Sequence, residues 1–196
     1  MDEHRPTLIA GGSIFDDLSA TLVVPVNCLG IVRFDDAREF KRRYPSWFAD
    51  YARRCQFGLV RVGEPFAWTP RDSSGPTIVN FPTKFHWRQR PAIDAIARGM
   101  KFLVFDAREM GIRKLAMPAL GCGIRQLHWA DIGPLMYQAL MRLELRGIRT
   151  TLHVPSYVSE SQRSHEYLAS ATRESGELFI PRPRLHAAQV AQNPAV

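Results

Sequence analysis

The feature that most constrains the fold is a regular alternation of short apolar runs with longer amphipathic runs between residues 77 and 155. Runs typical of strands stand at 76–82 (PTIVNFP), 113–120 (RKLAMPAL) and 150–155 (TTLHVP). Apolar side chains recur at helical spacing between them, from Pro91 to about Gly111 and from Ile132 to Gly147. Strands that alternate with helices pair in parallel through right-handed crossovers. The sequence therefore predicts an α/β fold, a three-layer α/β/α arrangement around a mixed, mostly parallel sheet.

The first part of the chain repeats this alternation with shorter elements. Strands are predicted at 7–15 (TLIAGGSIF), 20–27 (ATLVVPVN), 58–62 (GLVRV) and 65–70 (PFAWTP). The run 20–27 is almost continuously apolar, as expected of a strand that is buried on both faces. Two helices are predicted at 34–45 and 45–58, with Pro45 ending the first.

One domain is predicted over residues 1–157, followed by a helical segment and a loose tail over 158–196. The helix is expected within 161–174, packed on the domain or against a partner, and 181–196 has the composition of a tail. No apolar run approaches the roughly 20 residues of a membrane span. The start MDEHRPT lacks the apolar core of a secretory signal, so we expect a cytoplasmic protein without a membrane partner.

The charge of the chain favours a polyanionic partner. The formal net charge is +7 and the pI is near 9.8. Residues 156–196 contain four Arg and four acidic residues, so the excess lies in residues 1–155. A basic surface fits nucleic acid above all, and a generally basic soluble protein is the alternative. The three cysteines show no CxxC spacing, so neither a zinc site nor a redox pair is predicted. We expect no cofactor.

Three loops follow predicted strands and should converge, because ligands in such sheets lie outside the carboxyl ends of the strands. They are 26–34 (VNCLGIVRF), 80–87 (NFPTKFHW) and 119–129 (ALGCGIRQLHW). Gly121 and Gly123 allow backbone N–H groups to approach a phosphate, or they simply make a turn. Asn27 offers a donor and an acceptor to a ribose hydroxyl, or it caps its own loop in an Asx turn.

The middle loop carries a lysine that is either chemically active or an ordinary surface cation. Apolar walls and a cationic neighbour such as Arg88 can lower the pKa of an amine, which would make Lys84 a nucleophile or electrostatic catalyst. His86 is a candidate general acid–base group or a structural histidine. Phe85 and Trp87 are candidates for stacking on a nucleobase, with core packing as the alternative for at least one of them.

These three motifs, in this order over roughly residues 8–155, resemble the macrodomain family. They are most similar to the DarG-type antitoxin macrodomains, which remove ADP-ribose from thymidine in DNA. The resemblance implies a cleft for ADP-ribose at the strand ends and no metal. It implies that Lys84 is the catalytic residue, acting on the anomeric carbon of the distal ribose, which Asn27 positions. The loop of Gly121, Cys122 and Gly123 would wrap the diphosphate and ribose.

On this resemblance, further residues are predicted to bind the ligand or the nucleic acid. The ligand-binding set adds Ser13, Ile14, Gly30, Arg33, Thr83, His86, Trp87, Leu120 and Ile124. The nucleic-acid-binding set is Arg88, Arg90 and Arg125. The partners implied are ADP-ribose or ADP-ribosylated single-stranded DNA, and a cognate toxin that could bind residues 156–196.

The first loop departs from the family pattern, which leaves two functions open. Arg33, Phe34, Asp35 and Asp36 stand where the family has a glycine-rich segment, and Ser13 stands in place of an aspartate that contacts adenine. One function is an ADP-ribosyl glycohydrolase with an altered lid, in which Arg33 pairs with the diphosphate. The other is a non-catalytic module that binds nucleic acid or a modified nucleotide.

Overall fold

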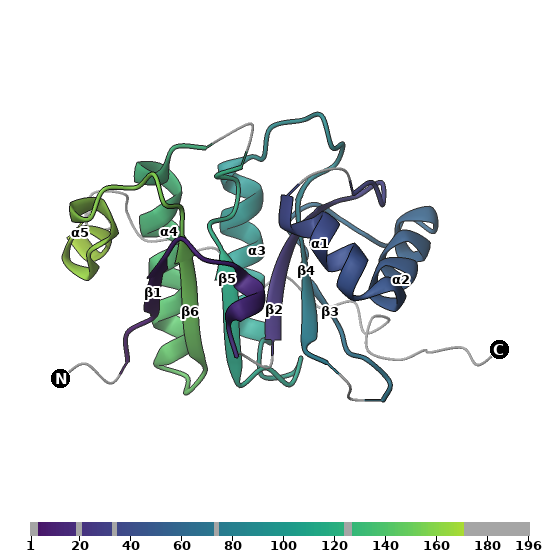
Figure 1. The fold of residues 1–196 in the computed structure, drawn as a ribbon, viewed down its shortest axis with the longest axis horizontal. Coiled ribbons are helices and arrows are strands. Elements are labelled where there is room, and N and C mark those ends of the chain that lie inside the picture. Colours follow the sequence, from purple (N-terminus) through teal and green to yellow (C-terminus); the bar gives the residue numbers. More distant parts are fainter. Residues whose placement is uncertain (1–3, 19–20, 33–34, 73–74, 124–126, 171–196) are drawn as a thin grey trace.

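A six-stranded sheet forms the centre of the molecule (Figure 1). The computed structural model describes residues 4–18, 21–32, 35–72, 75–123 and 127–170. The strands are β1 (Thr7–Ala10), β2 (Thr21–Asn27), β3 (Phe66–Trp68), β4 (Thr77–Lys84), β5 (Lys114–Pro118) and β6 (Arg149–Val154). They lie in the order β1-β6-β5-β2-β4-β3, and every pair is parallel except β3 with β4. The prediction of a mixed, mostly parallel sheet is confirmed.

Helices cover both faces of this sheet, which confirms the three-layer prediction. The helices are α1 (Asp35–Arg43), α2 (Pro45–Gln56), α3 (Ile93–Asp106), α4 (Trp129–Glu144) and the short α5 (His165–Ser170). Buried residues of α1 and α2 share one apolar cluster with β2 and β4, whereas those of α3 and α4 share a second cluster on the other face. The two clusters explain why residues 20–27 are almost continuously apolar: Val24 and Val26 face α1 and α2, and Val23 faces α3 and α4.

Helix boundaries follow local chemistry closely. Pro45 is the first residue of α2, a position where its missing N–H costs nothing, and Tyr44 separates the two helices. Pro91 was expected to begin α3, and this prediction is wrong by two residues because Ala92 is still extended (φ −98°, ψ 134°). Gly111 and Gly147 have φ of 73° and 75° and close the turns after α3 and α4.

Two strand predictions need correction. The strand predicted at 7–15 stops at Ala10, because Gly11 and Gly12 have positive φ and Ile14–Asp16 forms a 3₁₀ turn. Residues 58–62, all of which the structure describes, contain no strand. β2 and β3 occupy the two edges of β4. The segment that follows 58–62 contacts β4 through a backbone hydrogen bond from Gly63 N–H to the Pro82 carbonyl, at 2.8 Å.

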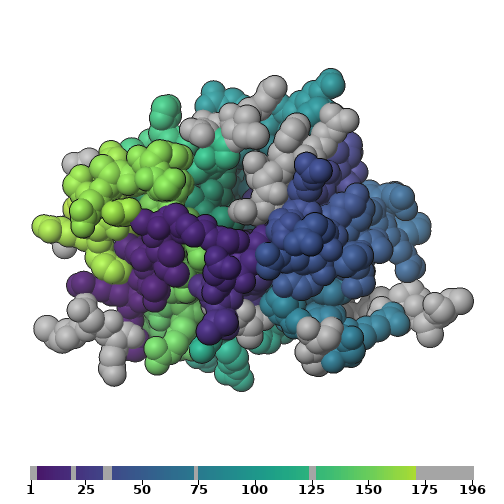
Figure 2. All heavy atoms as spheres, in the orientation of Figure 1, coloured from purple at the N-terminus to yellow at the C-terminus, as the bar shows by residue number. Residues whose placement is uncertain are grey.

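The described part of the C-terminal segment packs against α4. Trp129 Nε1 donates to the Gln162 carbonyl at 2.8 Å, the Tyr137 hydroxyl lies 2.9 Å from His165 Nδ1, and Leu168 is fully buried. Figure 2 shows the residues after β1 lying between this segment and α1. The helix predicted within 161–174 is a 3₁₀ turn followed by α5, and residues 171–174 and the predicted tail lie outside the described residues. The division of the chain after residue 157 stays a prediction.

The helices of the described residues are too short or too polar to cross a bilayer.

Candidate active site

A cleft of about 1020 Å³ opens where the parallel strands end, at the upper edge of the sheet in Figure 1. Its volume is that of a pocket for a sizeable small molecule. All three loops singled out in the sequence contribute to it: Asn27, Ile31 and Val32 after β2, Thr83, Lys84 and Trp87 at β4, and Gly121, Cys122 and Gly123 after β5. The prediction that these loops converge is confirmed.

A β-bulge places Lys84 opposite Asn27. Val26 pairs with Pro82, but Asn27 pairs with Lys84, so Thr83 is an extra residue on β4. The ladder continues beyond the bulge, since Cys28 N–H donates to the Phe85 carbonyl at 3.0 Å. Bulges re-aim side chains and are frequent next to active sites. Here the half-buried lysine and the buried asparagine face one cleft from adjacent strands.

The side-chain amide of Asn27 is engaged with its own loop. Its Nδ2 donates to the Ile31 carbonyl at 2.6 Å, while its Oδ1 accepts from Leu29 N–H at 2.9 Å and from Ile31 N–H at 3.3 Å. These bonds are those of the Asx-type alternative. The contact with a ribose hydroxyl stays a prediction.

Tyr51 fixes the backbone of the same residue from α2. Its hydroxyl donates to the Asn27 carbonyl at 2.7 Å, and its side chain is fully buried while also lining the cleft. Burial raises the pKa of Tyr51 far above its usual range, so the phenol keeps the proton that it donates.

The glycine loop after β5 is held tightly on its inner side. Gly121 has φ of 80°, and a Cβ atom there would lie 2.8 Å from Leu127 Cδ1. The Gly121 carbonyl accepts from Leu127 N–H at 2.9 Å. Cys122 is buried in the cleft wall, and this burial raises the pKa of its thiol to about 11. At neutral pH the Cys122 side chain is therefore an apolar surface rather than a nucleophile.

The outer part of the Lys84 loop carries a stack of planar side chains. The rings of His86 and Trp87 lie 5.6 Å apart at 29°, and the Arg88 guanidinium lies 4.7 Å from the Trp87 ring. His86 Nδ1 accepts from Arg88 N–H at 3.1 Å, which fits the structural role for this histidine. Phe85 is 57% exposed, so core packing does not explain it.

Several predicted residues lie elsewhere or beyond the described part. Ile14 lines the cleft, whereas the Ser13 hydroxyl caps the 3₁₀ turn by accepting from Phe15 N–H at 3.3 Å. Gly30 packs against α2, where its added Cβ would meet Ala52 Cα at 3.3 Å, and Leu120 is in the core. Arg88 and Arg90 are exposed beside the cleft-lining Trp87. Arg33, Ile124 and Arg125 lie outside the described residues.

The end of β6 forms a wall of the cleft that was not among the predicted site residues. His153, Pro155, Ser156 and Tyr157 line the cleft there. His153 Nε2 lies 3.4 Å from Asp17 Oδ2, and only 9% of each of these two side chains is exposed. Burial, together with the neighbouring Cys122, raises the pKa of Tyr157 to about 12. The signal was available, because 150–155 was a predicted strand and its carboxyl end had to meet the same edge of the sheet.

No cluster of three or more potential metal ligands occurs in the parts of the chain that the structure describes. The cleft presents the amine of Lys84, the amide of Asn27 and the backbone of the glycine loop. Such a set can bind a phosphorylated sugar and act on its anomeric carbon.

Comparison with known proteins shows which family of domains this chain matches. Residues 23–136 match the Macro domain. A curated relative, the DNA ADP-ribosyl glycohydrolase of Mycobacterium tuberculosis, is 38% identical over 123 residues, which are 62% of this chain and 35% of the relative. A second, from Thermosipho africanus, is named DNA ADP-ribosyl transferase-DNA ADP-ribosyl glycohydrolase fusion protein. It is 29% identical over 173 residues, which are 80% of this chain and 44% of the relative.

A solved structure shares the fold. It is Thermosipho africanus DarTG in complex with ADP-ribose, with a TM-score of 0.75 and 29% identity, covering 83% of this chain and 46% of that one. This chain thus spans less than half the length of the curated relatives that it matches. Residues 23–136, which match the Macro domain, include β3, β4 with its bulge, β5 and the glycine loop. The chain belongs to the Macro domain family.

Proposed function

We propose that this protein is an ADP-ribosyl glycohydrolase that releases ADP-ribose from DNA, with Lys84 as its catalytic residue. The observation that carries the proposal is the pairing of Lys84 with Asn27 across the bulge, inside a cleft that the glycine loop also lines. The names of the relatives support the reaction class, and the solved relative binds ADP-ribose. Because the chain spans only part of those proteins, their whole activity is carried over as a proposal.

The chemistry requires an unprotonated amine next to the anomeric carbon. The Lys84 nitrogen attacks that carbon, and the electron pair of the broken C–N bond leaves with the base, which then takes up a proton. Water next attacks the same carbon, which releases ADP-ribose and restores the amine. Lys84 is half-buried at the end of β4 and lines the cleft, which places its side chain beside a sugar bound there.

The nucleic acid partner is proposed to be single-stranded DNA with ADP-ribose on thymidine. The base must leave the cleft on the Lys84 side, where Phe85 is exposed and Trp87 carries Arg88 over its ring. Exposed aromatic and guanidinium groups stack on unpaired bases, and Arg88 and Arg90 supply positive charge for phosphates. We propose the same surface for both roles.

A second candidate function is binding without turnover. The Asn27 amide is already engaged with residues 29–31, and the family's glycine-rich first loop is replaced here at residues 33–36. Both features favour a module that holds ADP-ribose or a modified nucleotide and leaves the bond intact.

Release from a defined substrate separates these functions. A single-stranded oligonucleotide with one ADP-ribosylated thymidine is incubated with the protein, and the mass lost from the DNA is followed over time. We expect release by the wild type and a loss of activity on the order of a thousandfold in Lys84→Ala, because the nucleophile is gone. Lys114→Ala is the matched control, since this exposed lysine begins β5 at the far end of the sheet.

Binding of ADP-ribose, measured by calorimetry on the same proteins, shows whether each variant keeps an intact cleft. Full activity in Lys84→Ala would refute the lysine mechanism. An inactive wild type that binds ADP-ribose would establish the binding module instead.

We also propose that the protein counteracts a DNA ADP-ribosyl transferase as an antitoxin. The Thermosipho africanus relative, whose name joins a transferase to a glycohydrolase, supports this pairing. Growth of cells that express such a transferase should be restored by the wild type and not by Lys84→Ala. Equal rescue by both would point to direct binding of the toxin in place of removal of its product.

A further inference from the structure

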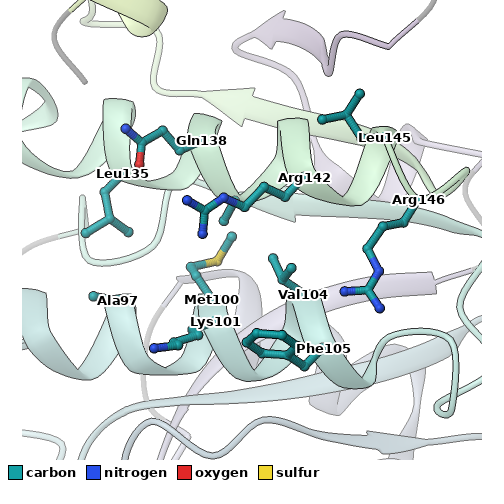
Figure 3. Close-up of a pocket in the computed structure, with 11 residues that line it drawn as sticks. Ala97, Met100, Lys101, Val104, Phe105, Leu135, Gln138, Arg142, Leu145 and Arg146 are labelled. Atoms are coloured by element: carbon teal, nitrogen blue, oxygen red, sulfur yellow. The ribbon is translucent and has the colours of Figure 1, made fainter. Parts of the chain in front are cut away.

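A second pocket, of about 350 Å³, lies between α3 and α4 and is separate from the cleft (Figure 3). It shares no lining residue with the cleft. The pocket begins one turn into α3 and extends past the end of α4, whereas the cleft lies where both helices begin. Its apolar lining consists of Ala97, Met100, Val104, Phe105, Leu135, Ala139 and Leu145.

The same pocket contains a buried lysine without an anion. Lys101 is only 9% exposed, and its Nζ has no hydrogen-bond partner among the described residues. Lysines usually extend their ammonium groups to water, and burying one without a partner is costly. Burial lowers the pKa of Lys101, and the nearby positive charge of Arg142 lowers it further. Nothing in the described structure compensates for this ammonium.

The charge around this pocket is entirely positive. Lys101, Arg142 and Arg146 are its charged lining residues, and no carboxylate lines it. Within the described residues, none of these three side chains forms a salt bridge. Leu145, at the rim, is 67% exposed and continues the apolar wall outward. A ligand that suits this surface presents a carboxylate next to an apolar group.

We propose that the α3–α4 pocket binds an acidic, amphipathic segment of a partner protein, with a carboxylate on Lys101 and an adjacent apolar side chain against Met100 and Phe105. Charge complementarity identifies the occupant as acidic. The apolar walls and Leu145 distinguish it from a nucleic acid backbone, which would leave them in water. The pocket is near the lower size limit for small-molecule sites and opens between two helices, the geometry in which amphipathic helices are held.

The α3–α4 pocket lies away from the cleft, so a partner bound there should not interfere with the reaction at Lys84. The cleft and the pocket are at different parts of α3 and α4, so a bound partner leaves the path to Lys84 open. The proposal goes beyond the glycohydrolase function and does not depend on it, because every measurement below is of binding or stability.

The test uses a synthetic helical peptide with leucine and glutamate along one face. It is titrated into the full chain carrying ¹³C-methyl methionine, and the methyl resonances are followed by NMR. We expect the Met100 resonance to shift while that of Met117, buried in β5, stays in place. Lys101→Met should weaken binding about tenfold or more, as should replacing the peptide glutamates with glutamine, because each removes one partner of a charged hydrogen bond.

Lys114→Met provides the matched control, since it removes an exposed lysine outside the pocket and should leave the affinity unchanged. Lys101→Met should also unfold at a higher urea concentration than the wild type, because a methionine needs no counter-ion. This second measurement shows that the variant is folded.

Four results would overturn the proposal. The peptide could bind Lys101→Met as tightly as the wild type, or Lys114→Met could lose as much affinity, which would indicate diffuse charge attraction. Octanoate could displace the peptide completely at equal concentration, which would make this a small-molecule pocket. A single-stranded oligonucleotide could shift the Met100 resonance, which would make it a nucleic-acid surface.

Discussion

Cys122 occupies the wall of the cleft as a thiol that burial keeps protonated. Its pKa is raised to about 11, and burial raises the pKa of Cys28 to a similar value. All three cysteines are free thiols, of which Cys28 and Cys122 are buried and Cys55 is half-buried. Their reactivity follows from burial, which the spacing of the cysteines along the chain does not reveal.

Alkylation should report this protonation directly. A pKa raised from 9.0 to about 11 lowers the thiolate fraction of Cys122 at pH 8 roughly a hundredfold. Because the folded-state pKa is raised, the thiolate appears only as pH rises, so the rate should climb about tenfold per pH unit until near pH 11. Iodoacetamide labelling followed by peptide mass spectrometry measures this rate.

Protein unfolded in urea provides the reference, since its cysteines should behave as ordinary thiols. A native Cys122 whose rate levels off near pH 9 would show that burial does not control its pKa. ADP-ribose should slow the labelling of Cys122 if the ligand occupies the glycine loop, whereas Cys28 does not line the cleft and should be unaffected.

At the scale of elements, α3 approaches β4 through a glycine. A Cβ added to Gly99 would lie 2.4 Å from Phe81 Cζ and 2.6 Å from Phe81 Cε1. Glycine in a helix interior costs up to about 1 kcal/mol relative to alanine, so propensity argues against this residue. Its position is explained by packing, because the Phe81 ring fills the space where a side chain would be.

Gly99→Ala should therefore destabilise the protein despite its better helix propensity. Overpacking a core contact of this kind costs about 1–3 kcal/mol in the free energy of unfolding, measured by urea denaturation. Gly75→Ala is the control, because the nearest atom to its added Cβ is Tyr44 Cε1 at an ordinary 3.5 Å. A Gly99→Ala variant as stable as the wild type would mean that α3 moves away from β4 at little cost.

The elements that could be predicted are those whose own residues form an apolar pattern that indicates burial. The runs 20–27 and 76–82 are apolar on both faces, and both became central strands. The run 58–62 has similar residues but no strand, because the edge of β4 pairs with Phe66–Trp68. Two segments compete here for one strand edge, which is an effect of tertiary structure, so the local residue pattern does not predict which one pairs. The local residue pattern does not predict the bulge at Thr83 either.

For the whole molecule, positive charge lies at both ends of the sheet. Arg88 and Arg90 are exposed beside the cleft. Exposed cations also gather at the opposite end, where β5 and β6 begin and α3 and α4 end: Arg108, Arg113, Lys114, Arg142, Arg146 and Arg149. The net charge of +7 predicted a polyanionic partner, but the net charge does not show where on the surface the cationic side chains lie. The strand order was also beyond the sequence, since it depends on which strands become neighbours.

Binding of single-stranded DNA should weaken steeply with salt. Each phosphate contact releases counterions, so a few contacts lower the affinity on the order of tenfold to a hundredfold between about 50 and 200 mM salt. Fluorescence anisotropy of a labelled oligonucleotide measures this dependence. Free ADP-ribose carries only the charge of one diphosphate, less than an oligonucleotide, and should show a much shallower response in the same buffers. A flat response for DNA would exclude the basic surface as its binding site.

The hydrogen bonds of Asn27 have a consequence for the thermodynamics of association. Because this side chain holds residues 29–31 by hydrogen bonds within its own loop, that rim of the cleft is ordered when the chain folds. Ordering a side chain during binding costs about 0.5–1.5 kcal/mol, and a preformed rim avoids this cost. A ligand that enters the cleft therefore contacts a preformed wall on that side. Its binding and release do not require residues 29–31 to refold.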